Sequence, residues 1–166
     1  ERVLNYSVAL KQEIYEKINN GNNIFLCHGR IRAFSKRFLR NFSWPDAITE
    51  DAYSYLECIR TGLLFRYQPS AAVYYRSPQN FADHYKQSKR FLYSKKELKK
   101  YFSLESLNQN YEIPAALMLH VLLKHLLKSP SYTFFYFLLH LMVRVMNILP
   151  HSYTSIWSPS YSSKRI

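Results

Sequence analysis

Acidic residues are scarce in this sequence of 166 residues. Asp and Glu together number 11 against 23 Lys and Arg, so the formal net charge is +12 at pH 7. A chain with this balance attracts anions over long distances. We therefore expect its partners to be anionic, such as nucleotides, phospholipids, nucleic acid or phosphorylated substrates.

Cysteine is also rare, and Cys27 and Cys58 are its two copies. They are not joined by a metal-type spacing, and the histidines form no ligand spacing with acids or cysteines, so the sequence predicts no metal site. Two unpatterned cysteines in a chain of this size indicate reduced thiols in a cytosolic compartment. We expect Cys58 to be a small core residue and not a nucleophile.

The abundant residues are apolar and aromatic, at 48% and 17% of the chain, which argues against disorder. Helical spacing predicts helices over 3–20 and 50–61, with Thr49 as the cap of the second, and Ser77 with Pro78 predicts a further helix start. Short apolar or alternating runs predict strands within "IFLCHGRIRAF", "LLFRYQ" and "AAVYYR". The first 100 residues therefore predict a mixed α/β fold.

Two apolar helical stretches follow within residues 113–149, and residues 113–166 contain no Asp or Glu. Polar residues recur at helical spacing along the two stretches: His120, Lys124 and Lys128 on the first, and His140, Arg144 and Asn147 on the second. A broad apolar face with a narrow cationic stripe is typical of a helix lying in the membrane interface. We favour this arrangement over a pair of core helices in a soluble bundle and over a membrane-spanning pair.

Two adjacent acids, Glu50 and Asp51, stand out because acids are so few. They could cap the helix that begins there, bind a metal or take a proton. The helix dipole stabilises an acid in the first turn by about 0.3–1 kcal/mol, and capping is the ordinary explanation of an isolated pair. Consecutive helical residues also point about 100° apart, so the two carboxylates cannot both face one substrate atom.

A second candidate set lies on the helix predicted after Pro78. Gln87, Arg90 and Phe91 are spaced so that they share one helix face. A guanidinium binds phosphate through two hydrogen bonds and an aromatic ring stacks on a sugar or base, so this face could hold a phosphorylated leaving group and a sugar together. The alternative is a solvated basic helix with Phe91 in the core.

The order of these features along residues 23–95 resembles the second half of processive-type family 2 glycosyltransferases, the group that includes cellulose, hyaluronan and poly-N-acetylglucosamine synthases. That group carries a "G...AFRR..L" segment, a "TED" motif, a "G..I.Y.P.A.V" segment and a Q-x-x-R-W motif. The corresponding stretches here read "GRIRAFSKRFL", "TED", "GLLFRYQPSAAVYY" and "QSKRF". Several matches in order are far more specific than any one alone.

The resemblance implies an architecture. Residues 1–100 would be the C-terminal portion of a catalytic domain, with part of a GT-A-like mixed sheet and flanking helices. Residues 101–149 would hold apolar, cationic-striped helices at the membrane interface, and residues 150–166 an irregular tail. Gly29, in the turn of the first matching stretch, is assigned to substrate binding.

The resemblance also implies an inverting transfer of a sugar from a nucleotide-sugar donor to a glycan or lipid-linked acceptor. Asp51 would be the general base that deprotonates the acceptor hydroxyl, and Glu50 would help to place its turn. Arg90 would offset the charge of the departing nucleoside diphosphate, while Gln87 and Phe91 would shape the acceptor end of the site.

Two departures from the family pattern affect what this chain can do. Phe91 replaces the Trp of the family motif, which removes the indole N–H and puts long-polymer processivity in doubt. The sequence also contains no Asp-x-Asp, the motif that holds the divalent ion bridging the donor diphosphate. We therefore expect this chain to be the C-terminal part of a larger enzyme, which binds Mg²⁺ or Mn²⁺ through the missing part, and to be inactive alone.

Two other functions fit parts of the sequence. Basic residues mixed with Tyr and Phe over 30–40 and 86–100 are what single-strand nucleic-acid binders use, but the apolar, acid-free C-terminal third does not fit that function. A non-enzymatic module on a membrane surface would use Glu50 and Asp51 as caps alone. We favour the transferase, located on the anionic cytoplasmic face of the cell membrane, with no nucleic-acid partner.

Overall fold

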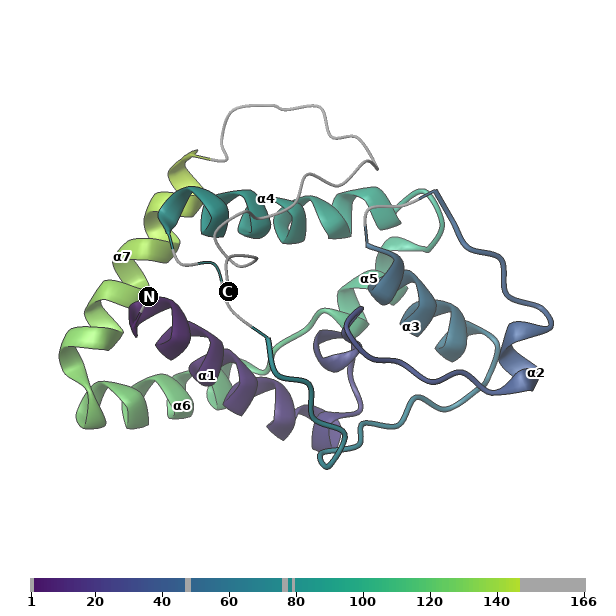
Figure 1. The fold of residues 1–166 in the computed structure, drawn as a ribbon, viewed down its shortest axis with the longest axis horizontal. Helices are drawn as coiled ribbons and strands as arrows, with labels where there is room; N and C mark the ends of the chain where they lie inside the picture. Colours follow the sequence, from purple (N-terminus) through teal and green to yellow (C-terminus); the bar gives the residue numbers. More distant parts are fainter. Residues whose placement is uncertain (1, 47–48, 76–77, 79, 147–166) are drawn as a thin grey trace.

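The computed structural model describes residues 2–46, 49–75, 78 and 80–146, which form helices joined by turns and irregular segments (Figure 1). The α-helices are α1 Arg2–Lys17, α2 Lys36–Leu39, α3 Glu50–Arg60, α4 Phe81–Leu98, α5 Leu104–Asn110, α6 Ala115–Lys128 and α7 Pro130–Met146. Two short 3-10 helices, η1 Ile18–Gly21 and η2 Ile24–Leu26, follow α1. Helices α1, α6 and α7 gather at one end of the molecule and α3 and α5 at the other, with α4 reaching from one group to the other (Figure 1).

The predicted α/β sheet is wrong, because the described ranges contain no β-strand. As far as they are described, "LLFRYQ" and "AAVYYR" are irregular backbone in which Leu64 is 76% exposed and Tyr74 is 99% exposed. A strand needs a neighbouring strand to take its backbone hydrogen bonds, and alternating side chains cannot supply one. In "IFLCHGRIRAF" the Asn23 side chain accepts a hydrogen bond from the backbone N–H of Phe25 and starts the turn η2 instead.

The helix predicted over 3–20 is present as α1 and ends in a tight left-handed turn. Asn19, Asn20 and Gly21 have φ values of 49°, 52° and 81°, a region that Asn and Gly tolerate better than other residues. A Cβ atom at Gly21 would also lie only 2.2 Å from a ring carbon of Tyr67. Gly21 is therefore required both by the backbone conformation and by the ring packed on it.

The start of α4 differs from its prediction. The helix begins at Phe81, where the side chain of Asn80 accepts a hydrogen bond from the backbone N–H of Asp83 at 2.9 Å. This bond satisfies a donor that the first helical turn would otherwise leave unpaired. Pro78 lies before the helix, and Ser77 lies outside the described residues.

Two buried clusters hold the helices together. The first joins α1 to α6 through Leu10, Ile14 and Val121, with side chains of α7 packed against them. The second surrounds α3 and brings together Ile24, Cys27, Ala52, Tyr55, Leu56, Leu98, Phe102 and Leu107. Since Cys27 belongs to the second cluster, the beginning of the segment 27–34 is packed against α3.

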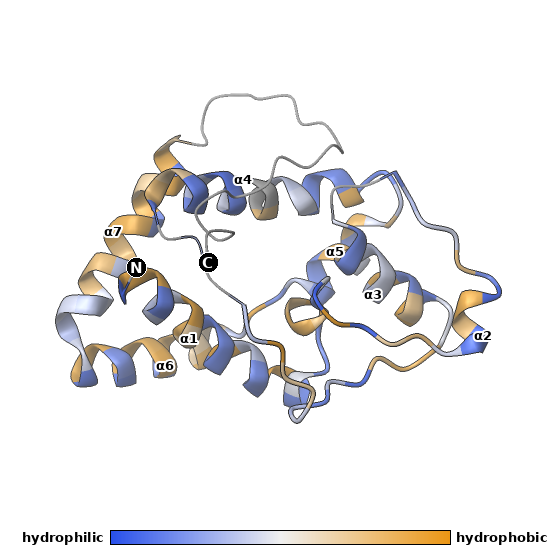
Figure 2. Cartoon of the chain, viewed as in Figure 1, coloured by the Kyte–Doolittle hydropathy of each residue, from blue (hydrophilic) through white to orange (hydrophobic). Residues whose placement is uncertain are grey.

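Helices α6 and α7 form a hairpin that is largely hydrophobic (Figure 2), and many of its large apolar side chains are exposed to solvent. This hairpin surface consists of Met118, Leu119, Leu123, Leu126, Leu127, Tyr132, Phe134, Phe135, Phe137, Leu138, Leu141, Met142, Val145 and Met146. Val121 and Tyr136 pack toward α1 instead, so the hairpin is anchored on one side and open on the other. Among the described helices, none has the length and apolar character needed to cross a bilayer.

An ion-pair cluster ties α6 to α1. The carboxylate of Glu13 lies 2.7 Å from Lys124 Nζ, 3.0 Å from His125 Nε2 and 3.2 Å from Lys17 Nζ. The hydrogen bond from Lys124 is the largest of several effects that lower the pKa of Glu13 to about 2. Lys124, which the sequence places in an exposed cationic stripe, is therefore partly engaged with α1.

This ion-pair cluster should make the free energy of unfolding depend on pH in the acidic range. Because the folded-state pKa of Glu13 lies below its ordinary value of 4.5, the stabilisation is present above that value and is lost as pH falls to about 2. We expect Glu13→Gln to lower the free energy of unfolding by about 1–2 kcal/mol at pH 6, allowing for solvent screening, and by almost nothing at pH 2. Urea unfolding at both pH values measures the difference, with Glu105→Gln as a control. A difference that does not change with pH would contradict the role given to this carboxylate.

Candidate functional site

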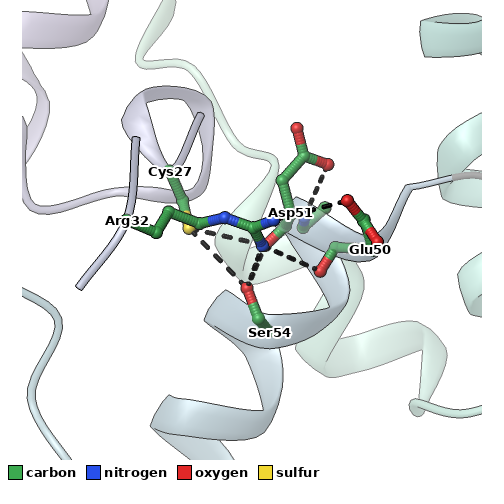
Figure 3. Close-up of polar contacts among 6 residues, drawn as sticks. Cys27, Arg32, Glu50, Asp51 and Ser54 are labelled. Carbon is green, nitrogen blue, oxygen red and sulfur yellow. Dashed lines mark hydrogen bonds and ion pairs between the residues drawn. The ribbon is translucent and has the colours of Figure 1, made fainter. Parts of the chain in front are cut away.

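The first turn of α3 carries Glu50 and Asp51, and the segment 27–34 lies against it (Figure 3). The thiol of Cys27 donates to the backbone oxygen of Asp51 at 3.4 Å. The hydroxyl of Ser54 donates to the same backbone oxygen at 2.8 Å. The turn that holds both acids is therefore fixed by buried side chains and not by the acids alone.

Arg32 is the central side chain of this arrangement (Figure 3). Its Nη1 donates to Ser54 Oγ at 2.9 Å and to the backbone oxygen of Glu50 at 3.4 Å, and its Nη2 lies 3.5 Å from Glu50 Oε1. The Arg32 side chain is 11% exposed, whereas that of Glu50 is 58% exposed. A guanidinium this buried orders the groups around it, because its five N–H donors lie in a fixed plane.

The two acids have different surroundings. Glu50 faces Arg32, while Asp51 uses Oδ1 to accept a hydrogen bond from the backbone N–H of Ala52 at 2.8 Å. Thr49 precedes the helix as predicted, but its side chain makes no capping bond and its Oγ1 is buried without a partner among the described residues. Asp51 therefore does part of the capping that the sequence assigned to Thr49.

Gly29 lies beside the second carboxylate oxygen of Asp51. A methyl group placed on Gly29 would be 3.6 Å from Asp51 Oδ2 and 3.9 Å from Arg32 Nη2. A side chain at this position would therefore be in van der Waals contact with the Asp51 carboxylate and the Arg32 guanidinium. The structure thus brings together Gly29, Arg32 and Asp51. The sequence assigned Gly29 and Asp51 to the site but not Arg32.

Burial is the main cause of the shifted pKa values of Cys27 and His28, which precede Gly29 in the chain. It raises the pKa of Cys27 to about 11, since a thiolate would lose its hydration there, and the nearby Arg32 only partly opposes this. It also lowers the pKa of His28, with the positive charge of Arg30 adding to the effect and Asp51 acting against it. Cys27 is therefore a neutral thiol at physiological pH and not a nucleophile.

Aromatic rings form one wall next to Arg32. Phe42 lies between Phe38, at 4.6 Å between ring centres, and Trp44, at 4.7 Å and nearly perpendicular. Phe34 contacts the same rings, and Trp44 remains 53% exposed. The Arg32 guanidinium lies 5.6 Å from the ring centres of Phe34 and Trp44, so the aromatic wall and the acidic turn meet at this one cation.

The second predicted set lies on α4, and no described contact joins it to Asp51. Phe91 is 64% exposed, so the alternative that placed it in the core is wrong. Gln87 is half-buried on the same helix, and the side chain of Arg90 lies outside the described residues. Ser94, one turn further along the same face, bonds to the hydroxyl of Tyr111 at 3.1 Å.

Metal ligands are not assembled at this turn. Within the described ranges, no three His, Cys, Asp or Glu side chains come together in a way that could hold a metal ion. Glu50 is also turned toward Arg32, whose positive charge would oppose a cation. The residues at this turn therefore do not fit a divalent ion, which the family resemblance assigns to an Asp-x-Asp motif that this sequence does not contain.

Sequence reasoning missed Arg32 and Trp44. Arg32 alternates with Arg30 in "GRIRAF", and Trp44 stands in "FSWPD", which reads as an ordinary loop. A basic residue and a tryptophan in irregular segments carry no periodic signal. Only the folding of residues 27–44 around α3 brings both side chains to the acidic turn.

Comparison with known proteins gives one family. The protein-family model described as "Glycosyl transferase family group 2" matches residues 14–159, which is most of the chain. Neither the curated proteins nor the solved structures contain a match.

Thiol reactivity tests whether this site is already formed in the folded chain. At pH 8 we expect iodoacetamide to modify Cys27 at least about tenfold more slowly than the less buried Cys58, and both at similar rates in urea. Mass spectrometry of Cys27→Ser and Cys58→Ser variants assigns each reaction to its site. Rapid modification of Cys27 in the folded protein would show that segment 27–34 does not stay packed on α3.

Proposed function

The chain belongs to glycosyl transferase family group 2, and from this premise we propose that it supplies the general base of an inverting glycosyl transfer. The donor is a nucleotide sugar, and the acceptor is a hydroxyl group of a glycan or of a lipid-linked sugar. The observation that carries the proposal is the position of Asp51 Oδ2 against Gly29, which has no side chain to cover it, within a turn held by Arg32.

The reaction forms one bond and breaks another at the anomeric carbon. The acceptor oxygen attacks that carbon while the carboxylate of Asp51 takes the hydroxyl proton, and the bond from the carbon to the diphosphate oxygen breaks. The nucleoside diphosphate leaves with the electron pair. Attack from the face opposite the leaving group inverts the configuration of the sugar.

The other predicted residues keep supporting roles in this proposal. Glu50 holds Arg32 and so places the turn, and Arg90 offsets charge on the leaving diphosphate. Gln87 and the exposed ring of Phe91 shape the acceptor end of the site. These roles need α4 to approach the acidic turn when substrate is bound.

The finer family assignment is also a proposal. The ordered stretches "GRIRAFSKRFL", "TED", "GLLFRYQPSAAVYY" and "QSKRF" support the group that includes cellulose and hyaluronan synthases. Since these 166 residues contain no Asp-x-Asp, we propose that the donor diphosphate and its Mg²⁺ or Mn²⁺ ion are held by residues outside them. This chain by itself is then inactive.

Replacing Asp51 separates a catalytic base from a helix cap. In the full-length protein we expect Asp51→Asn to lower kcat at least about 100-fold, because the amide cannot accept the proton. The amide oxygen can still accept the Ala52 N–H bond, so the melting temperature should change little. Radiolabelled sugar transfer and thermal unfolding measure the two effects.

Glu105→Gln provides the control, since it makes the same carboxylate-to-amide change in the first turn of α5. Retention of most of the transfer activity by Asp51→Asn would leave this carboxylate with a structural role alone.

We further propose that the hairpin surface rests on an anionic membrane, at the cytoplasmic face of the cell membrane. Its apolar side chains would enter the acyl boundary, while Lys128 and Arg144 reach lipid phosphates. The sequence supports this surface as partner because residues 113–166 contain no acid that an anionic leaflet would repel. Contact with a membrane would also explain why fourteen large apolar side chains of this one hairpin are exposed.

Vesicle binding tests the hairpin surface. We expect the chain to sediment with vesicles of phosphatidylcholine and phosphatidylglycerol and more weakly with phosphatidylcholine alone. Leu127→Glu, at a side chain 87% exposed on α6, should weaken binding about tenfold or more. Leu64→Glu makes the same change at a side chain 76% exposed outside the hairpin and should have little effect.

Equal losses for the two variants, or binding to single-stranded DNA in preference to vesicles, would reject the hairpin as the membrane contact.

A further inference from the structure

Trp44 offers an exposed ring beside the proposed reaction centre. It makes T-shaped contacts with two phenylalanine rings. The distance between ring centres is 4.7 Å to Phe42 and 5.9 Å to Phe34, and the interplanar angles are 88° and 82°. These two rings fix the orientation of the indole while 53% of the residue stays exposed. A large ring that is held rigidly and left half open is suited to bind a ligand at little entropic cost.

Arg32 connects this ring to the reacting groups. Its guanidinium lies 5.6 Å from the centre of the Trp44 ring, and its Nη2 lies 3.9 Å from the position of a methyl group on Gly29. Asp51 Oδ2 lies 3.6 Å from that same position. One guanidinium therefore lies near both the aromatic ring and Gly29, next to the proposed base.

From this arrangement we propose that Trp44, Arg32 and Gly29 form the subsite for the acceptor sugar. The apolar C–H face of a pyranose ring stacks on Trp44, and its reacting hydroxyl lies against Gly29, where no side chain separates it from Asp51 Oδ2 and Arg32 Nη2. There the hydroxyl oxygen accepts a hydrogen bond from Arg32 and donates its proton to Asp51. This assignment rests on the proposed glycosyl transfer and names the residues that select its acceptor.

The charges of the site favour a neutral sugar over a phosphate group. Glu50 lies 3.5 Å from Arg32 and offsets its charge, and Asp51 Oδ2 lies 3.6 Å from the methyl position on Gly29. Two carboxylates would repel a diphosphate, whereas hydroxyl groups can pair with both the guanidinium and the carboxylates. The aromatic ring and the few polar groups together match the two faces of a sugar.

Arg32 is a positioning residue in this scheme as well as a ligand of the hydroxyl. It bonds to Ser54 Oγ and to the backbone of Glu50, so it sets the position of the turn that carries Asp51. Lysine keeps the positive charge but cannot make the same set of bonds in one plane. Arg32→Lys should therefore disturb acceptor use more than donor use.

Tryptophan fluorescence tests the subsite directly in the 166-residue chain. The sequence contains Trp44 and Trp157, so Trp157→Phe leaves Trp44 as the single indole reporter. Titration with cellotetraose or chitotetraose should produce a saturable change in emission. Adding Gly29→Ala should weaken that binding about tenfold, since the methyl group would lie 3.6 Å from Asp51 Oδ2 and would crowd the hydroxyl bound there. Tyr74→Ala, at a ring 99% exposed elsewhere, is the matched control and should not change the affinity.

Kinetics of the full-length protein supply the second readout. Trp44→Ala should raise the KM for the acceptor about tenfold with the KM for the donor unchanged, and Trp44→Phe should restore most of the affinity. The absence of a saturable response to both sugars, equal affinities for the Gly29→Ala and parent chains, or a higher donor KM in Trp44→Ala would each overturn the assignment.

The two proposals fail in different ways. A full-length protein that transfers no sugar while Trp44 still binds the oligosaccharides would reject the glycosyl transfer and keep the sugar subsite. Transfer that is insensitive to Trp44→Ala would reject the subsite and keep the transfer.

Discussion

One buried amide, that of Asn23, holds the chain at the point where it passes from α1 to the residues of the cluster around α3. Its Nδ2 donates to the backbone oxygens of Tyr15 and Ile18 at 2.7 and 2.8 Å, and its Oδ1 accepts from the backbone N–H of Phe25 at 3.1 Å. The residue is 3% exposed, so these bonds face no competition from water. The same side chain therefore joins the end of α1 to the start of η2, and the segment 27–34 that carries part of the candidate site follows η2 directly.

The polar site and the hairpin surface belong to different groups of helices, and α4 links them. At its first turns Tyr85 donates a hydrogen bond to the backbone oxygen of Met146 on α7. At its last turn Leu98 is fully buried in the cluster around α3. A hairpin held at a surface would therefore fix, through α4, how far the acidic turn stands from that surface.

Local patterns predicted the helices well and the strands badly, for one physical reason. A helix satisfies its backbone hydrogen bonds within its own residues, so the apolar spacing of 50–61 and the glycine at Gly62 were enough to predict α3. A strand depends on a partner that may lie anywhere in the chain, and alternating residues in "AAVYYR" do not provide one. The α/β prediction failed for this reason, and the irregular segments that replaced the strands carry part of the site.

The sequence by itself determined the family, the position of Glu50 and Asp51 in a first helical turn, and an apolar, acid-free C-terminal third. These features depend on residue order and local spacing, which the sequence records directly. The tertiary structure alone decided that Arg32 holds that turn and that Trp44 stands beside it, because neither lies in a periodic element. Their contacts form only when irregular segments, whose paths depend on buried side chains such as Asn23, pack against α3.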